Sequence, residues 1–556
     1  MSIHNITPMY NEAAFTPRKK LRIVTIGAGF SGLILAHKIQ HEHVNDMKDL
    51  VDHVIYEAKD VVGGTWVNNT YPGVQCDVPS VIYQLPFDPT PQWSNYYSSG
   101  PEILADMQAK TKKWNLDRDI KFSHKVTSAV WVENQSQWEV TVCPAGGKEF
   151  IDWADVLVSA RGFLHDWNWP SITNLLSFQG KLVHSAAWDH SSDFRNKKIA
   201  IIGNGSSGVQ ILPEMAKLEG TTVVNFIQGP AWVFGGLPPA ALLGGNDPSF
   251  NPAYGEADIE RFQNDPKAFL EYRKRIQNSY SRVFQIYQKG SIQQQLITQA
   301  AKASMMAKLN HRRDLCEQLI PEWEVGCRRI TPGEPFLEAF LKPNVRLTSS
   351  KITNVDATGI LTKDGTYYDF DVIICATGFN IAQIPPFPII GRDDISLADK
   401  WSFEPESYLS IMCPGMPNYF IFTGPNATVG HGSLLPSLDW SAEYMIKFMR
   451  KMAREDIASV TPKQDAADEF NRYGDAIHKS LVWTGNCSSW FKKNGPDARV
   501  TANWPGSSLL FYDMIKEIRG EDFEIRYRSP NRFRFMGNGY MAYERNDTAD
   551  LAFYMK

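Results

Sequence analysis

Two glycine-rich strings, far apart in the chain, contain the residue types that bind the phosphates of a dinucleotide. Each follows a short apolar run typical of a buried strand and precedes a segment with helical spacing. The strings are Gly27-Ala28-Gly29-Phe30-Ser31-Gly32 and Gly203-Asn204-Gly205-Ser206-Ser207-Gly208. Such glycines permit a tight turn and a close approach of the backbone to a pyrophosphate at the N-terminus of the following helix. Two such units predict two dinucleotides, with hydride passing from a nicotinamide to a flavin.

The residue that follows the second strand of each unit indicates which nucleotide binds there. Glu57 stands 25 residues after Gly32 (57 minus 32), near the distance expected of an acid that binds ribose hydroxyls. An acid disfavours a 2′-phosphate, so the first site suits FAD or NAD. Gln228 stands 20 residues after Gly208 (228 minus 208). Its amide can hydrogen-bond a phosphate but cannot neutralise it.

Length and composition limit the class of protein. A chain of 556 residues is too long for one core, and 43% hydrophobic with 21% charged residues is an ordinary globular composition. The net charge of -4 gives no reason to expect nucleic acid. We find no apolar signal segment and no run near the ~18 apolar residues of a spanning helix. Seven cysteines without a C-x-x-C pair suit reduced thiols. We therefore expect a soluble, cytoplasmic protein with no membrane partner and no metal.

Two further strings resemble those of a known family. The first, Gly63-Gly64-Thr65-Trp66 with Tyr71-Pro72-Gly73 and Asp77, meets every position of [AG]-G-x-W-x4-[FY]-P-[GM]-x3-D. The second has the form F-x-G-x-x-x-H-x-x-x-W-D and runs through Phe178, Gly180, His184, Trp188 and Asp189. Both are similar to strings of the Baeyer–Villiger monooxygenases, which are flavoenzymes that insert one oxygen atom next to a ketone carbonyl.

The resemblance implies a reaction and its catalytic residues. NADPH reduces FAD, a flavin peroxide forms from O2 and attacks a ketone, and an ester or lactone results. Asp77 faces the active site and orients an arginine. The string Gly326-Cys327-Arg328-Arg329 resembles the family's G-x-[KR]-R. By that resemblance Arg328 reaches the 2′-phosphate, and Arg329 projects into the active site and stabilises the developing negative charge.

The resemblance also implies further cofactor contacts. The segment with Gly64, Thr65, Trp66 and Tyr71 wraps the flavin. Thr377 and Gly378 lie in a strand and turn that lead from the NADP domain back to the FAD domain. Trp490, in a Ser-Trp pair, contacts the nicotinamide side from a mobile loop. His184 and Trp188 couple domain movement to cofactor binding and act as neither acid nor base.

Two residues depart from the family's pattern. Gln228 stands where NADP-dependent members usually have an arginine. Loss of one charge-assisted contact, worth roughly 1.5–3 kcal/mol, weakens the preference for NADP by about one to two orders of magnitude. Arg161, in Ser159-Ala160-Arg161-Gly162, replaces a small hydroxyl residue of an A-T-G turn. It either alters the hinge there or points to solvent.

The predicted fold is α/β, a two-site flavoprotein with two Rossmann-like domains. We expect the first part of the FAD domain at 1–165, the NADP domain at 166–370 with a helical insert at 235–325, and the second part of the FAD domain with a C-terminal extension at 371–556. Alternating residues near 523–543 predict a half-buried strand pair. The expected partners are a small-molecule ketone and O2, in a monomer or weak homo-oligomer.

Other interpretations stay open. Asp77 could cap a loop, the two arginines could form a solvated pair, and Trp490 could simply lie under a loop. The runner-up is an N- or S-oxygenating flavin monooxygenase, which shares the two nucleotide sites. A nucleotide-binding protein without catalytic activity is a further alternative, and a disulfide reductase is disfavoured because C-x-x-C is absent.

Overall fold

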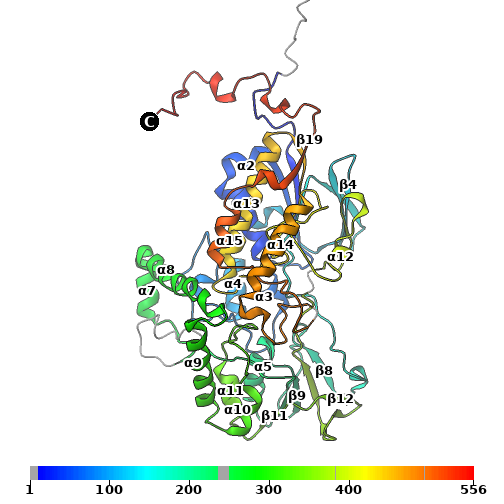
Figure 1. Ribbon diagram of the computed structural model, residues 1–556, viewed down its shortest axis with the longest axis vertical. Helices are drawn as coiled ribbons and strands as arrows, with labels where there is room; N and C mark the ends of the chain where they lie inside the picture. Colours follow the sequence, from blue (N-terminus) through cyan, green and yellow to red (C-terminus); the bar gives the residue numbers. More distant parts are fainter. Residues whose placement is uncertain (1–10, 236–248, 382–383, 494, 556) are drawn as a thin grey trace, which may run out of the picture.

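Two five-stranded parallel sheets lie in the two halves of the molecule, as Figure 1 shows for the computed structural model, which describes residues 11–235, 249–381, 384–493 and 495–555. The first sheet has the order β17 (Tyr419–Ile421), β7 (Val156–Ser159), β1 (Leu21–Ile26), β2 (Val51–Tyr56), β3 (Ile120–Lys121). The second has the order β11 (Val345–Thr348), β10 (Thr222–Phe226), β9 (Lys198–Ile202), β15 (Val372–Cys375), β8 (Lys181–His184). The expected α/β fold with two nucleotide-binding units is therefore confirmed.

Burial explains why the central strands are nearly continuous apolar runs. Parallel strands that are covered on both faces need apolar side chains on both. In β1 every residue except Arg22 is buried or nearly so, and its register pairs Leu21 with Val51 and Ile23 with both His53 and Val156. One end of the chain supplies β1, whereas β17 comes from residue 419 onward, so both ends build the first sheet.

The same three-layer arrangement occurs twice. One face of the first sheet packs on helices, and the other packs on a mixed sheet. That mixed sheet has the order β16 (Ile389–Ile390), β4 (His124–Val132), β5 (Gln137–Pro144), β6 (Phe150–Ala154). The second sheet likewise packs on helices on one face, and on the other it packs on a small antiparallel sheet. The small sheet has the order β12 (Ile352–Val355), β13 (Gly359–Thr362), β14 (Tyr367–Asp369).

Helices between β10 and β11 form the segment that we expected to be a helical insert (green in Figure 1). They are α7 (Glu256–Asn264), α8 (Pro266–Arg282), η5 (Val283–Tyr287), α9 (Ile292–Lys308), α10 (Arg313–Leu319) and α11 (Glu334–Ala339). Both flanking strands belong to the second sheet, so this segment interrupts one nucleotide-binding unit. The expected insert begins at 235, and its residues 236–248 lie outside the described part of the chain.

The remaining helices and strands surround both parallel sheets and extend to the C-terminal part of the chain. Those of the first half are α1 (Phe30–His37), η1 (Lys38–Glu42), α2 (Val44–Leu50), α3 (Thr65–Asn68), η2 (Ser80–Ile82), α4 (Gly100–Lys113), η3 (Leu116–Asp119), η4 (Leu175–Ser177) and α5 (Ser206–Met215). Those of the second half are η6 (Arg392–Asp394), α12 (Leu397–Lys400), α13 (Leu434–Arg454), β18 (Ile457–Pro462), α14 (Gln464–Lys479), η7 (Val482–Thr484), α15 (Ser508–Ile515), η8 (Gly520–Asp522), β19 (Phe523–Tyr527), η9 (Arg534–Met536) and η10 (Ala542–Arg545).

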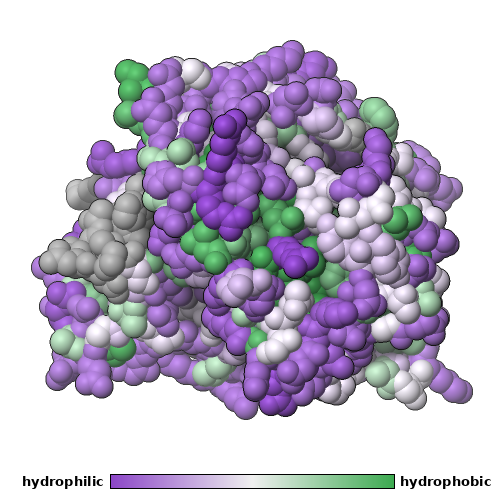
Figure 2. Space-filling model, turned by 90° about the horizontal axis from the view of Figure 1, so that it is seen from below, coloured by the Kyte–Doolittle hydropathy of each residue, from purple (hydrophilic) through white to green (hydrophobic). Residues whose placement is uncertain are grey.

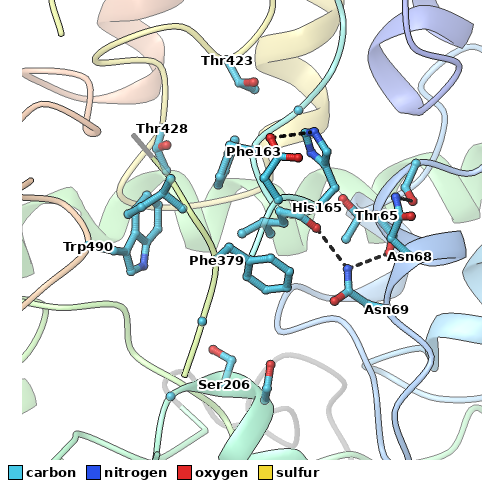
Figure 3. A pocket seen from close by; sticks show the side chains of 18 of the residues that line it. Thr65, Asn68, Asn69, Phe163, His165, Ser206, Phe379, Thr423, Thr428 and Trp490 are labelled. Atoms are coloured by element: carbon cyan, nitrogen blue, oxygen red, sulfur yellow. Dashed lines mark hydrogen bonds and ion pairs between the residues drawn. The ribbon is translucent and has the colours of Figure 1, made fainter. Parts of the chain in front are cut away.

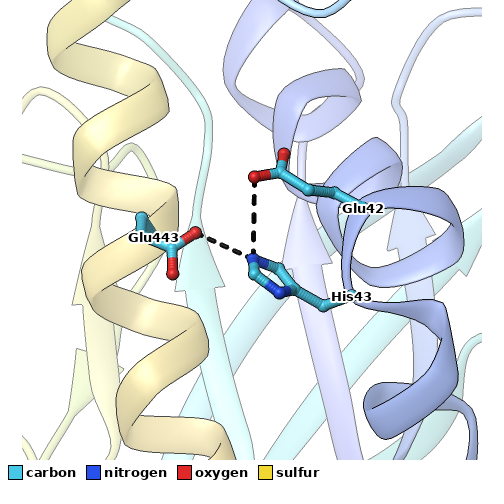
Figure 4. A group of neighbouring side chains, drawn as sticks. All are labelled: Glu42, His43 and Glu443. Atoms are coloured by element: carbon cyan, nitrogen blue, oxygen red, sulfur yellow. Dashed lines mark hydrogen bonds and ion pairs between the residues drawn. The ribbon is translucent and has the colours of Figure 1, made fainter. Parts of the chain in front are cut away.

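A polar cluster joins the N-terminal helices to α13 (Figure 4). His43 Nε2 lies 2.9 Å from Glu443 Oε2 and 3.8 Å from Glu42 Oε1. The ammonium group of Lys38 lies 3.0 Å from Glu42 and 3.4 Å from Glu443, and it also reaches Asp439 at 3.2 Å. The carboxylates therefore already face a cation, and the cluster acts as an ion-pair network between two helical segments.

Two predictions about chain segments need correction. Strand β15 lies in the second sheet, so the chain leaves that sheet only after Cys375 and not at residue 371. Of the expected strand pair near the C-terminus, only Phe523–Tyr527 is a strand, and its antiparallel partner is β18 rather than the residues that follow it. Further along, residues 534–536 and 542–545 form the short 3-10 turns η9 and η10, and the carbonyls of Phe535 and Tyr540 accept hydrogen bonds from the N–H groups of Phe15 and Ala14.

The outer surface agrees with the composition. On the face seen from below in Figure 2, most residues are hydrophilic, and hydrophobic residues show mainly in its central part. None of the helices in the described part of the chain has both the length and the apolar character that crossing a bilayer requires.

Candidate active site

A cavity of about 1290 Å³ lies between the two parallel sheets. Residues at the carboxyl ends of both sheets line it, among them Tyr56, Ala160, Ile202 and Ala376. Ligands of parallel α/β sheets bind at this edge of the strands. A typical pocket for one small molecule has about 300–1,000 Å³, so this cavity has room for more than one ligand.

The two glycine-rich turns meet this cavity with the same geometry. Gly27 has φ +106° and Gly203 has φ +113°, a backbone conformation that side chains other than glycine rarely adopt. A Cβ atom would lie 2.7 Å from the carbonyl oxygen of Ala160 at Gly27, and 2.4 Å from that of Ala376 at Gly203. The glycines therefore let each turn pack against a neighbouring strand end.

Each turn leads into a helix that begins at the cavity. Gly29 precedes α1 and Gly205 precedes α5. The first N–H groups of a helix have no partner within that helix and attract a pyrophosphate. The residues that line the cavity include Phe30, Ser31, Ser206 and Ser207, while Gly32 and Gly208 lie behind them, where a Cβ atom would overlap the carbonyl oxygen of Gly27 or Gly203. Both turns thus fit the phosphates of a dinucleotide.

Glu57 lies directly beside the first turn. Its Oε2 accepts a hydrogen bond from the Ala28 N–H at 2.7 Å, and its Oε1 accepts one from the Lys59 N–H at 2.9 Å. The residue is nearly buried and lines the cavity. These bonds fix the carboxylate at the end of β2, which is the position that a ribose-binding acid requires.

The segment 63–77 crosses from the first unit toward the second. Gly64 lies against Gly29, and Thr65 and Trp66 begin the short helix α3 at the cavity wall. Tyr71 donates a hydrogen bond to Gln210 Oε1 of α5 at 2.9 Å. Burial raises the pKa of Tyr71 to about 12, so the hydroxyl stays protonated and able to donate this bond near neutral pH.

Asp77 and Arg329 form a bidentate ion pair at the cavity. Arg329 Nε donates to Asp77 Oδ2 at 2.5 Å, and its terminal nitrogen donates to Oδ1 at 2.6 Å. The two residues are 252 positions apart. Attraction to Asp77 raises the pKa of Arg329 above its usual value. The side chain of Arg329 is 37% exposed and that of Asp77 is 20% exposed. Both residues line the cavity. The exposed part of the Arg329 guanidinium can therefore face a ligand there.

Arg328 also lines the cavity, but it has a different environment. Burial lowers its pKa, and among the described residues it has neither a hydrogen bond nor an ion pair. Gln228 lies just after β10 on the same cavity wall and is exposed there. An arginine without an anionic partner, at the end of the second unit, is suited to bind a phosphate group.

Three further predicted contacts lie on the cavity wall, and Figure 3 shows one of them, Trp490. Thr377 and Gly378 follow β15. The indole of Trp490 lies across the cavity from Thr65 and Asn69, with Ser206 of α5 below them in this view. The ring centroids of Trp490 and Phe163 are 5.8 Å apart. Side chains from both units and from the C-terminal part thus surround one space.

The string from Phe178 to Asp189 contains β8, an edge strand of the second sheet, and its proposed role in coupling domain movement to cofactor binding stays a prediction. His184 ends β8 and stacks on Trp167 with centroids 4.2 Å apart. Its Nε2 lies 3.3 Å from Thr377 Oγ1, and burial lowers its pKa to about 4. The ring is therefore neutral near pH 7. It joins β8 to the turn that bears Thr377.

Packing and hydrogen bonds account for the other members of this string. A Cβ atom on Gly180 would lie 2.5 Å from the Phe178 ring, so only glycine fits beneath that ring. Trp188 packs on Phe194 with centroids 5.2 Å apart. Asp189 accepts hydrogen bonds from Lys181 and from the Ser191 N–H. None of these four residues lines the cavity.

Arg161 does not point to solvent. Its side chain is 11% exposed, and its guanidinium donates to Asp166 Oδ2 at 2.8 Å. It also lies 3.2 Å from His165 Nε2. The second alternative for this residue is therefore wrong, because an acid five positions later in the chain holds the arginine at the cavity wall. An effect on the hinge stays a prediction.

The expectation that all seven cysteines are reduced thiols is also wrong. Cys327 and Cys487 form a disulfide, with Cα atoms 6.3 Å apart and 160 positions between them in sequence. The other five cysteines are free. A pairing over this distance leaves no local pattern, and only the folded chain brings the two residues together.

Some residues that line the cavity belong to no motif that could be identified from the sequence. Tyr83 packs edge-to-face on Phe30 with centroids 5.5 Å apart. Thr428 is held by hydrogen bonds between its loop and residues 502–504. Both line the cavity. Their positions depend on long-range contacts, so neither spacing nor residue type could have indicated them.

The fold and the two nucleotide turns define a flavin-type oxidoreductase with two dinucleotide sites. Residues 19–238 match the flavin-binding monooxygenase-like family. The FAD-binding monooxygenase tazF of Aspergillus terreus is 41% identical over 543 residues, which cover 97% of this chain and 95% of tazF. The FAD-binding monooxygenase moxY of Dothistroma septosporum is 34% identical over 95% of this chain and 83% of moxY. The chain therefore belongs to the flavin-binding monooxygenases.

Solved structures share the fold at lower identity. Cyclohexanone monooxygenase from Rhodococcus sp. Phi1, bound to NADP+, has a TM-score of 0.76 at 24% identity and covers 92% of this chain and 99% of its own. A steroid monooxygenase bound to NADP has a TM-score of 0.75 at 24% identity, covering 92% and 100%. The protein is a flavin-dependent monooxygenase with the fold of these enzymes.

Proposed function

We propose that this enzyme inserts one oxygen atom from O2 next to the carbonyl of a ketone, with FAD and NADPH as cofactors. The product is an ester or, from a cyclic ketone, a lactone. The observation that carries the proposal is the Asp77–Arg329 pair, whose guanidinium has surface in the cavity between both nucleotide turns. That cyclohexanone monooxygenase shares the fold and is named for a ketone supports this choice.

The residues at the cavity fit the two cofactors. The turn at Gly27 with α1 and Glu57 would hold the pyrophosphate and ribose of FAD, and the turn at Gly203 with α5 would hold those of NADPH. Bound flavin, once reduced, supplies the activation of O2. Arg328, which lacks an anionic partner among the described residues, would bind the 2′-phosphate.

Arg329 would stabilise negative charge on the reacting oxygen atoms. A donor that is already aimed at developing charge in a closed site needs no rearrangement during the reaction, and its removal typically costs about 2.7–4 kcal/mol. Asp77 accepts two hydrogen bonds from one edge of the guanidinium and so fixes its orientation. At any pH near neutrality Arg329 keeps its charge, because Asp77 raises its pKa further.

The test compares Arg329→Ala with Arg329→Lys. We expect both variants to bind flavin and to be reduced by NADPH, since Arg329 lies outside both glycine turns. Ester formation should fall about 100-fold to 1000-fold in Arg329→Ala, whereas Arg329→Lys keeps a charge and should retain part of the rate. Ester formation at the wild-type rate in Arg329→Ala would contradict the proposal. Wild-type enzyme that oxygenates amines or sulfides but leaves ketones unchanged would favour the N- or S-oxygenating alternative.

A further inference from the structure

The Cys327–Cys487 disulfide joins two loops that both line the cavity. Cys327 directly precedes Arg328 and Arg329, and Cys487 lies three positions before Trp490. Every residue from 486 to 490 lines the cavity, as do both arginines. The bond therefore connects the segment that would bind the 2′-phosphate to the segment that carries Trp490.

The arginine segment is packed firmly on its own side. A Cβ atom on Gly326 would lie 2.8 Å from the ring of Tyr287, so the backbone presses on that ring. Tyr287 belongs to a buried cluster that includes Val482 and Trp483. Cys327 is fully buried, and its N–H donates to the Glu324 carbonyl at 3.1 Å. The disulfide thus has a rigid anchor at Cys327.

The other segment, 486–490, is held at its two ends and by the ring of Trp490, which packs on Phe163 and Phe491. Before it, Gly485 accepts a hydrogen bond from the buried ammonium of Lys492 at 2.7 Å. After it, Phe491 packs in the same buried cluster. Among the described residues, no hydrogen bond or ion pair joins 486–490 to 324–330. The sulfur–sulfur bond is therefore the specific connection between this loop and the arginine segment.

We propose that Cys327 and Cys487 are positioning residues, and that their disulfide holds loop 486–490 over the nicotinamide nucleotide and slows its release. This inference rests on the proposed use of NADPH. The loop carries Trp490, which faces the space between both nucleotide turns (Figure 3). A loop that is fixed by a covalent bond stays closed without the entropic cost of ordering it, whereas a loop held only by noncovalent contacts can open.

The thiol–disulfide state would then control nucleotide retention. A dithiol such as dithiothreitol reduces the pair by exchange: its thiolate attacks one sulfur, the Cys327–Cys487 bond breaks, and two cysteine thiols form. Two electrons and two protons pass to the protein, and the reductant closes its own disulfide. Cys487 lines the cavity, which gives a small dithiol a route to a pair that is otherwise buried.

The experiment measures the rate at which labelled NADP+ leaves the flavin-loaded enzyme during a chase with unlabelled NADP+. We compare wild type with Cys327→Ser, Cys487→Ser and the double variant, each before and after dithiothreitol. Cys316→Ser is the matched control, because Cys316 is a free cysteine outside the cavity. We expect release about tenfold faster wherever the disulfide is absent, which corresponds to about 1.4 kcal/mol.

Non-additivity is the decisive part of the result. If the residues act through their shared bond, both single variants, the double variant and reduced wild type show the same increase, and dithiothreitol adds nothing to the variants. Reduced wild type keeps every atom of both side chains, so it excludes an effect of misfolding. Unchanged release after reduction, single effects that add up, or seven reactive thiols in the unreduced protein would each overturn the inference.

The readout separates this inference from the proposed reaction. Release of NADP+ does not depend on whether a ketone or another substrate is oxygenated. An enzyme that releases NADP+ faster when the disulfide is reduced, but never forms an ester, would support the inference and contradict the proposed oxygenation of a ketone. An enzyme that forms an ester, but releases NADP+ at the same rate with the disulfide intact or reduced, would support the proposed reaction and contradict the inference.

Discussion

Replacement of Arg328 by alanine should separate nucleotide binding from stability. Arg328 lines the cavity, has no hydrogen bond or ion pair among the described residues, and has a pKa that burial lowers. A hydrogen bond to a charged group contributes roughly 1.5–3 kcal/mol, so loss of one contact with the 2′-phosphate should weaken NADP+ binding about 10-fold to 150-fold. NAD+ lacks this phosphate, and its affinity should change less than about threefold.

The same substitution that weakens NADP+ binding should leave the free energy of unfolding unchanged or raise it. A partly buried charge without a partner is unfavourable in the nucleotide-free protein, so Arg328→Ala should be at least as stable as wild type without NADP+. We would measure NADP+ and NAD+ affinities by calorimetric titration, and stability by denaturant unfolding. Arg195→Ala is the control, because Arg195 is exposed and its one ion-pair partner among the described residues is Asp193. Equal losses of NADP+ and NAD+ affinity, or a clear loss of stability, would refute the assignment.

Three further predictions concern the second unit. Gln228→Arg should raise the NADP+ over NAD+ preference about 10-fold to 100-fold, since it supplies a charge-assisted contact; equal affinities in a competition titration would contradict this. Gly203→Ala should lower the free energy of unfolding by about 1–3 kcal/mol or more, because of its φ and the overlap with Ala376, whereas Gly205→Ala, with open space around its Cβ atom, should cost less than about 1 kcal/mol. The pKa of His184 is lowered from 6.5 to about 4, so the unfolded state binds this proton more readily and the free energy of unfolding falls as pH drops from 6.5 to 4. His184→Gln should reduce that fall by up to about 3 kcal/mol. An equal reduction in the variant of exposed His190, His190→Gln, would contradict this prediction.

The parts of the fold that follow from local rules could be predicted from the sequence. Buried parallel strands need apolar runs, and a turn that packs on a strand end needs glycine, so β1 and β9 with their turns were visible as patterns. The pairing of Asp77 with Arg329 across 252 positions followed only from the family resemblance. Nothing in the spacing of the two residues alone indicates it.

The features that the sequence did not reveal depend on contacts between distant segments. The disulfide joins residues 160 positions apart. Strand β19 alternates as predicted, but its partner β18 lies more than sixty positions earlier. Arg161 is drawn to Asp166 only because the chain turns between them at the cavity wall. In each case the residue types are compatible with several partners, and the tertiary fold selects one.

The most direct test of the account is one turnover with isotopically labelled O2. The flavin-loaded enzyme is first reduced by NADPH without oxygen, then mixed with labelled O2 and a panel of simple ketones. We predict that NADPH bleaches the flavin, and that an ester or lactone forms with one labelled oxygen atom for each NADPH consumed. Flavin that is reduced and then reoxidised while every ketone stays unchanged, or flavin that NADPH never reduces, would contradict the account.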